Sequence, residues 1–138
     1  MQIFTHGETP EKDRELFARI GELALSKAVQ DDLGVCPTSE PGRIWFVLDG
    51  QEGFASVQML KNGTAHMRHL WATQSAGRKK LIKNAIKKAR QHGAKAVRAV
   101  EKTGKAAKTL ISLGFAEIDI RGQYSTLEYT YESEKPEK

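Results

Sequence analysis

Apolar residues near the start of the chain recur every three to four positions, which is the period of an amphipathic helix. They are Leu16, Phe17, Ile20, Leu23, Ala24 and Ala28. Thr9 is a favourable N-cap and Pro10 suits the first helical position, while Gly34 can supply a left-handed end. The pattern predicts a helical region from Thr9 to about Leu33, divided into two pieces at Gly21.

Short apolar runs separated by turn residues follow, after a loop at residues 35–42 that holds two prolines. Strands are expected at residues 44–48, 54–60 and 64–71. A turn at residues 49–53 and the hairpin signal Asn62-Gly63 join these runs, and such short connections link antiparallel neighbours. The sequence therefore predicts an antiparallel meander of three strands.

The helical period returns after Thr73. One face of this segment is apolar, with Leu81, Ile82, Ala85, Ile86 and Ala89, and the opposite face is basic, with Lys80, Lys83, Lys87 and Arg90. We expect this helix to end at Gly93, before a strand at residues 94–100 and a second amphipathic helix at residues 105–113 that Gly114 ends. The order strand, helix, strand implies a parallel pair of strands with right-handed connections.

The end of the chain returns to an alternating pattern. Residues 115–120 and 124–131 alternate apolar and polar positions around Gly122, which predicts a final pair of strands. Residues 132–138 are expected to be disordered. Because 138 residues suit one hydrophobic core, we expect a single α/β (α+β) domain over residues 1–131, with a mixed, mostly antiparallel central sheet flanked by helices.

Composition narrows the class of protein. Hydrophobic residues make up 39% of the chain, and none of its apolar runs approaches the roughly 18 residues that a membrane span needs. Residues 1–9 lack the basic start and apolar stretch of a signal peptide, so we expect a cytoplasmic protein without a membrane partner. Cys36 has no second cysteine to pair with, and one cysteine with four scattered histidines predicts no metal site.

Charge is distributed unevenly along the chain. The net charge is +5, but residues 78–108 hold 12 Lys and Arg against the single acid Glu101. The rest of the chain holds 10 basic and 16 acidic residues. Such segregation indicates a surface that attracts polyanions, with a solvated helix face as the simpler interpretation.

A specific motif stands at the start of the basic helix. The turn after the third expected strand reads Gln-Ser-Ala-Gly-Arg-Lys at residues 74–79. This turn and the order of elements around it resemble the GNAT acyltransferase superfamily, whose turn has Arg or Gln, two residues, Gly, one residue, and Gly or Ala. Gln74 and Gly77 match that pattern, and Lys79 replaces the last small residue. Residues 89–94, where the helix is expected to end, fit the family as well.

The resemblance implies that the turn binds acetyl-CoA or another acyl-CoA. Free amides and the dipole at a helix N-terminus suit a pyrophosphate. The small residues Ser75, Ala76 and Gly77 would let the ligand approach the backbone, and the basic side chains after them would add ionic contacts. The side chain of Lys79 is expected to point outward. The expected cofactor-binding residues are Leu70, Ala72, Gln74, Ser75, Ala76, Gly77, Arg78, Lys79 and Lys80.

The resemblance also implies transfer of an acyl group to a primary amine. By position, the main-chain amide of Leu70 would polarise the thioester carbonyl. Thr103 and Leu110 replace the Asn and the thiolate-protonating Tyr of the family's second helix. By residue type, Tyr124 is then the best substitute for the general acid.

The attacking amine must also lose a proton to a base or to water. The candidate bases are His66, His69, Glu52 and Glu101. Because side chains alternate along a strand, we expect His66 on the face of Leu70 and His69 on the opposite face. The choice of face stays open, and His66 joins Leu70 and Tyr124 as the predicted catalytic residues.

Three functions are compatible with these patterns. The first is an acyl-CoA-dependent N-acyltransferase that acts on a primary amine. The second is a catalytically degenerate binding protein of the same fold, which would contact nucleic acid or a protein through Lys80, Lys83, Lys87 and Arg90. The third is a transferase of this kind that modifies nucleic acid. The sequence gives no prediction of the oligomeric state.

Overall fold

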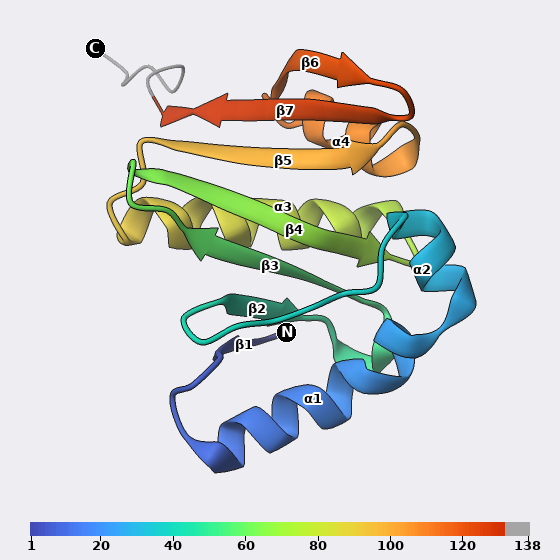
Figure 1. The fold of residues 1–138 in the computed structure, drawn as a ribbon, viewed down its shortest axis with the longest axis vertical. Coiled ribbons are helices and arrows are strands. Elements are labelled where there is room, and N and C mark those ends of the chain that lie inside the picture. Colours follow the sequence, from blue (N-terminus) through green and yellow to red (C-terminus); the bar gives the residue numbers. More distant parts are fainter. Residues whose placement is uncertain (132–138) are drawn as a thin grey trace.

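The computed structural model describes residues 1–131, in which a seven-stranded sheet forms the centre of the fold and carries helices on both faces (Figure 1). The strands are β1 (Gln2–Thr5), β2 (Ile44–Val47), β3 (Gly53–Met59), β4 (Thr64–Ala72), β5 (Ala96–Lys102), β6 (Ala116–Arg121) and β7 (Tyr124–Thr130). The helices are α1 (Pro10–Leu25), α2 (Lys27–Leu33), α3 (Ser75–Gln91) and α4 (Lys105–Ser112), with a 3-10 turn at Asp49–Gln51. The tail predicted at residues 132–138 lies outside the described residues.

The strand order is β1-β2-β3-β4-β5-β7-β6. Neighbouring strands run antiparallel except β4 and β5, which are parallel and joined by α3. The predicted meander of β2, β3 and β4, the parallel crossover and the final strand pair are therefore all present. The predicted mixed, mostly antiparallel α+β fold is confirmed.

Two hydrophobic clusters fill the space between the sheet and its helices. Alternate residues of β2 belong to different clusters, since Phe46 packs with α3 and α4 whereas Trp45 packs with α1 and α2. On α3 the predicted apolar face is buried, with Leu81, Ile82, Ala85 and Ala89 in the core. The period of 3.6 residues in this segment thus corresponds to a helix that covers one face of the sheet.

The N-terminal part of the chain differs from the prediction in two places. Residues 2–5 form β1, an edge strand paired with β2, which the sequence pattern did not reveal because Phe4 is its single buried residue. The helical region divides at Ser26 and not at Gly21, which lies inside α1. Ser26 has extended backbone angles, and its hydroxyl accepts a hydrogen bond from the amide of Val29, so it serves as the N-cap of α2.

Apolar and polar residues alternate in both β6 and β7, but only in β7 does the alternation correspond to a buried face. In β7, Ser125, Leu127 and Tyr129 are buried, as the alternation predicts. Every residue of β6 is exposed, including the apolar Ile118 and Ile120. As the last strand of the sheet, β6 pairs only with β7, and its alternation has no buried side.

Candidate functional site

The two parallel strands at the centre of the sheet part before they end. Paired residues run from Thr64 with Ala96 to Met67 with Ala99, and the pairing stops there. Both strands continue, β4 to Ala72 and β5 to Lys102, and Figure 1 shows them diverging toward their C-terminal ends. Polar backbone and side chains at this end of the sheet therefore face an opening instead of a neighbouring strand.

The opening contains two cavities. The first, of about 370 Å³, is lined by Asp31, Asp32, Leu70, Trp71, Ala72, Arg78, Glu101, Lys102, Thr103, Gly104, Lys105 and Ala106. The second, of about 210 Å³, is lined by Leu33, Val35, His66, Arg68, His69, Val100, Glu101 and Tyr124. Among the described residues, Glu101 alone lines both.

A β-bulge in β4 separates the residues of the two cavities. Phe54 of β3 pairs with Trp71 and Ser56 pairs with Arg68, so the two residues His69 and Leu70 stand opposite one residue of β3. His69 has a φ of 57°, in the left-handed region that residues other than glycine rarely adopt. The hydroxyl of Ser56 donates a hydrogen bond of 3.0 Å to the main-chain oxygen of Arg68 beside the bulge.

The extra residue reverses the alternation of side chains along β4. Leu70 packs in the same cluster as Met67 and Ala72, under α3, whereas His66 lines the second cavity on the other side. The prediction that His66 shares a face with Leu70 is therefore wrong. A strict period of two cannot anticipate a single inserted residue.

His69 holds the bulge in place. Its Nε2 accepts a hydrogen bond of 3.3 Å from the amide of Thr38, and its ring stacks on Trp45 with 6.0 Å between ring centroids. Burial lowers the pKa of His69 to about 4, and the cations of Arg43 and Arg68 act in the same direction. With its Nε2 engaged and its ring stacked, His69 has a structural role at the bulge, and its role as a base stays a prediction.

The first turn of α3 borders the first cavity. Gln74 precedes the helix with extended backbone angles, and the first helical hydrogen bond runs from the amide of Arg78 to the oxygen of Gln74. The amides of Ser75, Ala76 and Gly77 have no hydrogen-bond partner among residues 1–131. Three free amides at the positive end of a helix of 17 residues form a site that favours an anion.

Two residues of this turn also make contacts within the fold. A Cβ on Gly77 would lie 2.8 Å from Cδ1 of Leu48, so the missing side chain allows α3 to pack closely against the end of β2. Arg78 is buried, and its Nη2 donates a hydrogen bond of 3.0 Å to the oxygen of Ala72. Gly77 and Arg78 thus have structural contacts in the fold, and their predicted contacts with a ligand stay predictions.

The expected cofactor-binding residues divide between the first cavity and the exposed start of α3. Leu70, Ala72 and Arg78 line the cavity, while Gln74, Ser75, Ala76, Lys79 and Lys80 are exposed at the start of α3. The side chain of Lys79 is exposed, as predicted. It is therefore not packed over the free amides at the start of α3. Among the predicted cofactor-binding residues, Leu70, Ala72 and Arg78 thus line the first cavity, and the others stay predictions.

Glu101 is the most unusual side chain of the site. It is 5% exposed, its Oε1 has no hydrogen-bond partner in the described part of the chain, and burial raises its pKa to about 8. It was one of four candidate bases in the sequence, and two signals could have singled it out. It is the only acid in the basic segment, and it continues the buried alternation of Val97 and Ala99.

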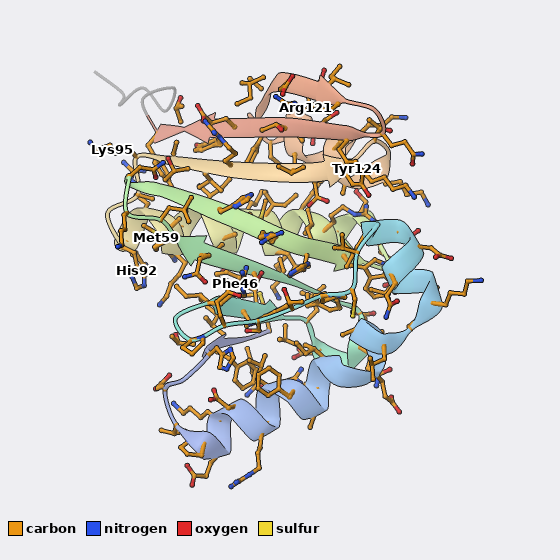
Figure 2. The ribbon with its side chains drawn as sticks, in the orientation of Figure 1. Phe46, Met59, His92, Lys95, Arg121 and Tyr124 are labelled. Atoms are coloured by element: carbon orange, nitrogen blue, oxygen red, sulfur yellow. The ribbon has the colours of Figure 1, made fainter. Side chains whose placement is uncertain are left out.

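The remaining catalytic candidates fall on different sides of the site. His66 lines the second cavity, its Nε2 is buried without a partner within residues 1–131, and burial together with Arg68 lowers its pKa. Tyr124 also lines the second cavity, and its hydroxyl packs against Gly34 at the end of the sheet near α2, where Figure 2 labels it. Glu52 is exposed and lines neither cavity.

Helix α2 is tied across the opening. Nε1 of Trp71 in β4 donates a hydrogen bond of 3.1 Å to the carboxylate of Asp32, and Nζ of Lys102 in β5 donates one of 3.1 Å to the oxygen of Asp31. One helix end thus contacts both of the diverging strands. Leu110, which takes the place of the family's tyrosine, is completely buried and contributes nothing to either cavity.

The basic face of α3 lies outside these cavities. Lys80, Lys83, Lys87 and Arg90 are exposed, as predicted. Lys83, Lys87 and Arg90 line a separate shallow cavity of about 320 Å³ with Ile86, Leu113 and Tyr129. In the described residues, no helix has the length and apolar character needed to cross a membrane, and no group of three or more ligand side chains is placed to hold a metal ion.

Comparison with solved structures identifies the fold. An apo structure of TofI superposes with a TM-score of 0.66 at 14% identity, covering 94% of this chain and 91% of that one. An acyl-CoA N-acyltransferase from Pseudomonas aeruginosa gives a TM-score of 0.65 at 12% identity, covering 94% and 97%. The chain has the GNAT fold.

A larger GNAT-fold neighbour is N-acetylglutamate synthase from Neisseria gonorrhoeae, complexed with coenzyme A and L-arginine. Its TM-score is 0.57 at 14% identity, and the match covers 94% of this chain but 32% of the synthase. In sequence, the chain matches no family model and no curated protein. The likeness to solved structures is thus one of fold.

Proposed function

We propose that the chain is an acyl-CoA-dependent N-acyltransferase, with the acyl-CoA in the first cavity and a primary amine in the second. The observation that carries this proposal is the parting of β4 and β5, which opens two cavities that share Glu101. A thioester and an amine that enter from the two sides would meet at this residue. With both substrates bound at once, the amine can attack the thioester directly, because holding two reactants together makes their reaction effectively unimolecular.

The start of α3 supports acyl-CoA as the donor. Its free amides at Ser75, Ala76 and Gly77 suit the pyrophosphate, with Lys79 and Lys80 as exposed cations nearby. Structural neighbours are named as acyl-CoA N-acyltransferases, and one was solved with coenzyme A. Acetyl-CoA is the smallest such donor and the one we propose. The main-chain amide of Leu70, at the bulge, is the proposed donor to the carbonyl oxygen of the thioester.

The proposed reaction needs one proton acceptor and one proton donor. The ammonium group of the acceptor gives a proton to the carboxylate of Glu101, the free amine forms the new C–N bond, and the C–S bond breaks. The second proton of the nitrogen goes to the leaving thiolate, either directly or through Tyr124. We assign the base to Glu101 rather than His66, because Glu101 lines both cavities whereas His66 lines only the second.

Binding of acetyl-CoA tests the proposal directly by calorimetry. We expect Ala76→Glu to weaken binding at least 10-fold, because a carboxylate would occupy the anion site at the helix N-terminus. Gln91→Glu makes the same change of charge at the far end of α3 and should leave the affinity within about twofold. The proposal fails if millimolar acetyl-CoA does not bind, or if the two variants bind alike.

A second candidate function rests on the exposed basic face of α3. We propose Lys80, Lys83, Lys87 and Arg90 as phosphate contacts for nucleic acid, as either the ligand of a binding protein or the acceptor of a transferase. Binding to duplex DNA should then fall with salt, with a log-log slope of about −0.9 for each neutralised phosphate. A slope near zero, or no binding at low salt, rejects this candidate.

A further inference from the structure

The second cavity has one side that is apolar and one that is positively charged. Leu33, Val35 and Val100 supply the apolar side. Arg68 is exposed at the rim, and its guanidinium has no hydrogen bond or ion pair among residues 1–131. Arg98, which lies on a neighbouring strand, is by contrast paired with Glu128 at 2.6 Å. Arg68 is therefore a cation that the fold does not itself neutralise.

The two histidines and Glu101 also line the second cavity. Burial lowers the pKa of His66 and of His69, so both imidazoles are neutral. Burial raises the pKa of Glu101 to about 8, so its carboxyl is mostly protonated before a ligand enters. A small cavity with one unpaired guanidinium attracts an anionic group, and Arg binds carboxylates through two parallel hydrogen bonds.

We propose that the acceptor is a small amine that also carries a carboxylate and an apolar body, as an apolar amino acid does; this inference rests on the proposed acyl transfer. The carboxylate binds Arg68 at the rim, the apolar body lies against Leu33, Val35 and Val100, and the amine reaches Glu101. A volume of about 210 Å³ suits a molecule of this size and is below that of pockets for larger ligands.

The charges of such an acceptor also complete the site. Its ammonium group stabilises the carboxylate of Glu101, which releases its own proton to solvent and becomes the base for the reaction. The net change is one amide and one thiol formed from one ammonium and one thioester, with one proton released. An amine without an anionic group would leave Arg68 unpaired. The cavity, of about 210 Å³, has room for one small acceptor molecule.

Matched acceptors test the assignment. With acetyl-CoA as donor, L-leucine is compared with 3-methylbutylamine, which has the same side chain and amine but no carboxylate. We expect kcat/KM to favour L-leucine by about 10- to 100-fold in the wild-type protein, the usual effect of a charge-assisted hydrogen bond. Phosphoethanolamine serves as an acceptor with a different anion.

Variants separate the role of Arg68 from intrinsic amine reactivity. Arg68→Gln should reduce the preference for L-leucine to less than about threefold, while Arg68→Lys restores part of it. Arg98→Gln removes a neighbouring cation that lines neither cavity and should keep the full preference. Binding of acetyl-CoA, measured alongside, should be the same in all three variants, since Arg68 lies outside the first cavity.

Each outcome decides a separate question. Equal use of both amines by the wild-type protein, or an unchanged preference in Arg68→Gln, overturns the assignment of the carboxylate. Faster reaction of phosphoethanolamine than of L-leucine replaces the carboxylate by a phosphate. If acetyl-CoA does not bind at all, the proposed function fails. If acetyl-CoA binds and its acetyl group is transferred to 3-methylbutylamine but not to L-leucine, the proposed function stands and only the acceptor class is refuted.

Discussion

The clearest test of the buried carboxyl is the change Glu101→Gln, measured as protein stability at several values of pH. Glutamine has nearly the same shape but cannot ionise. The charged and titratable side chains that line the cavities around Glu101 are Asp31, Asp32, His66, Arg68, His69, Arg78, Lys102, Lys105 and Tyr124. All of these remain in the variant, so their titrations affect both proteins and cancel when the two are compared.

The expected difference follows from the two states of the carboxyl group. In the unfolded chain Glu101 loses its proton near pH 4.5, whereas in the folded protein burial raises the pKa to about 8. The raised pKa therefore stabilises the fold below pH 4.5, and this stabilisation is lost as the pH rises toward 8. Each pH unit between the two pKa values costs about 1.4 kcal/mol, which gives about 3 kcal/mol between pH 5 and pH 7.5.

Urea unfolding of both proteins at pH 5, 6, 7 and 7.5 gives the measurement. The free energy of unfolding of Glu101→Gln minus that of the wild type should rise by about 3 kcal/mol over this range. Glu52→Gln changes an exposed carboxylate that lines neither cavity and should give a difference that stays within about 0.5 kcal/mol. A flat difference for Glu101→Gln would refute the reasoning, because the carboxyl would then ionise as easily in the fold as in water.

Three further changes probe the fold. Gly53→Ala should lower the free energy of unfolding by more than about 2 kcal/mol, because its Cβ would lie 2.5 Å from the oxygen of Trp71. Gly21→Ala should instead raise the free energy of unfolding by about 0.5–1 kcal/mol, because open space surrounds that position in α1. Equal effects in urea unfolding would contradict the geometry of β3 and β4. Asparagine suits a left-handed backbone, so His69→Asn should keep the bulge. As the pH falls from 6.5 to 4, the wild type should lose about 2–3 kcal/mol of stability relative to this variant, because His69 takes up a proton in the unfolded chain at a higher pH than in the folded protein. A stability difference between these two proteins that does not change with pH would show that His69 is not held neutral.

The sequence predicted the features that depend on many residues acting together. The apolar face of α3, with Leu81 and Ile82, is visible as a period because each turn of the helix repeats it. The parallel crossover follows from element order alone, whatever the side chains. The turn at residues 74–79 could be recognised because Gln74 and Gly77 match the GNAT turn at the point where the helical period of α3 begins.

The features that the sequence did not predict depend on single positions. One inserted residue at His69 reverses the order of side chains in β4, and nothing in the local composition marks it. Arg78 is a basic residue in a basic segment, yet it folds back onto the oxygen of Ala72. The edge strand β1 has four residues and a single buried side chain, too few to show an alternation. Such features follow from tertiary contacts, which pattern analysis does not contain.

The bulge in β4 has a consequence for how this protein could change over time. A single strand presents His66 and Arg68 to one cavity and Leu70 and Ala72 to the other. In the proposed acyl transfer, substitutions at residues 66 and 68 would alter the choice of acceptor while the walls of the first cavity stay as they are. The two cavities are lined by different positions of the same strand. Descendants of this chain can therefore acquire a new substrate by point mutations in the second cavity, while the first cavity stays the same.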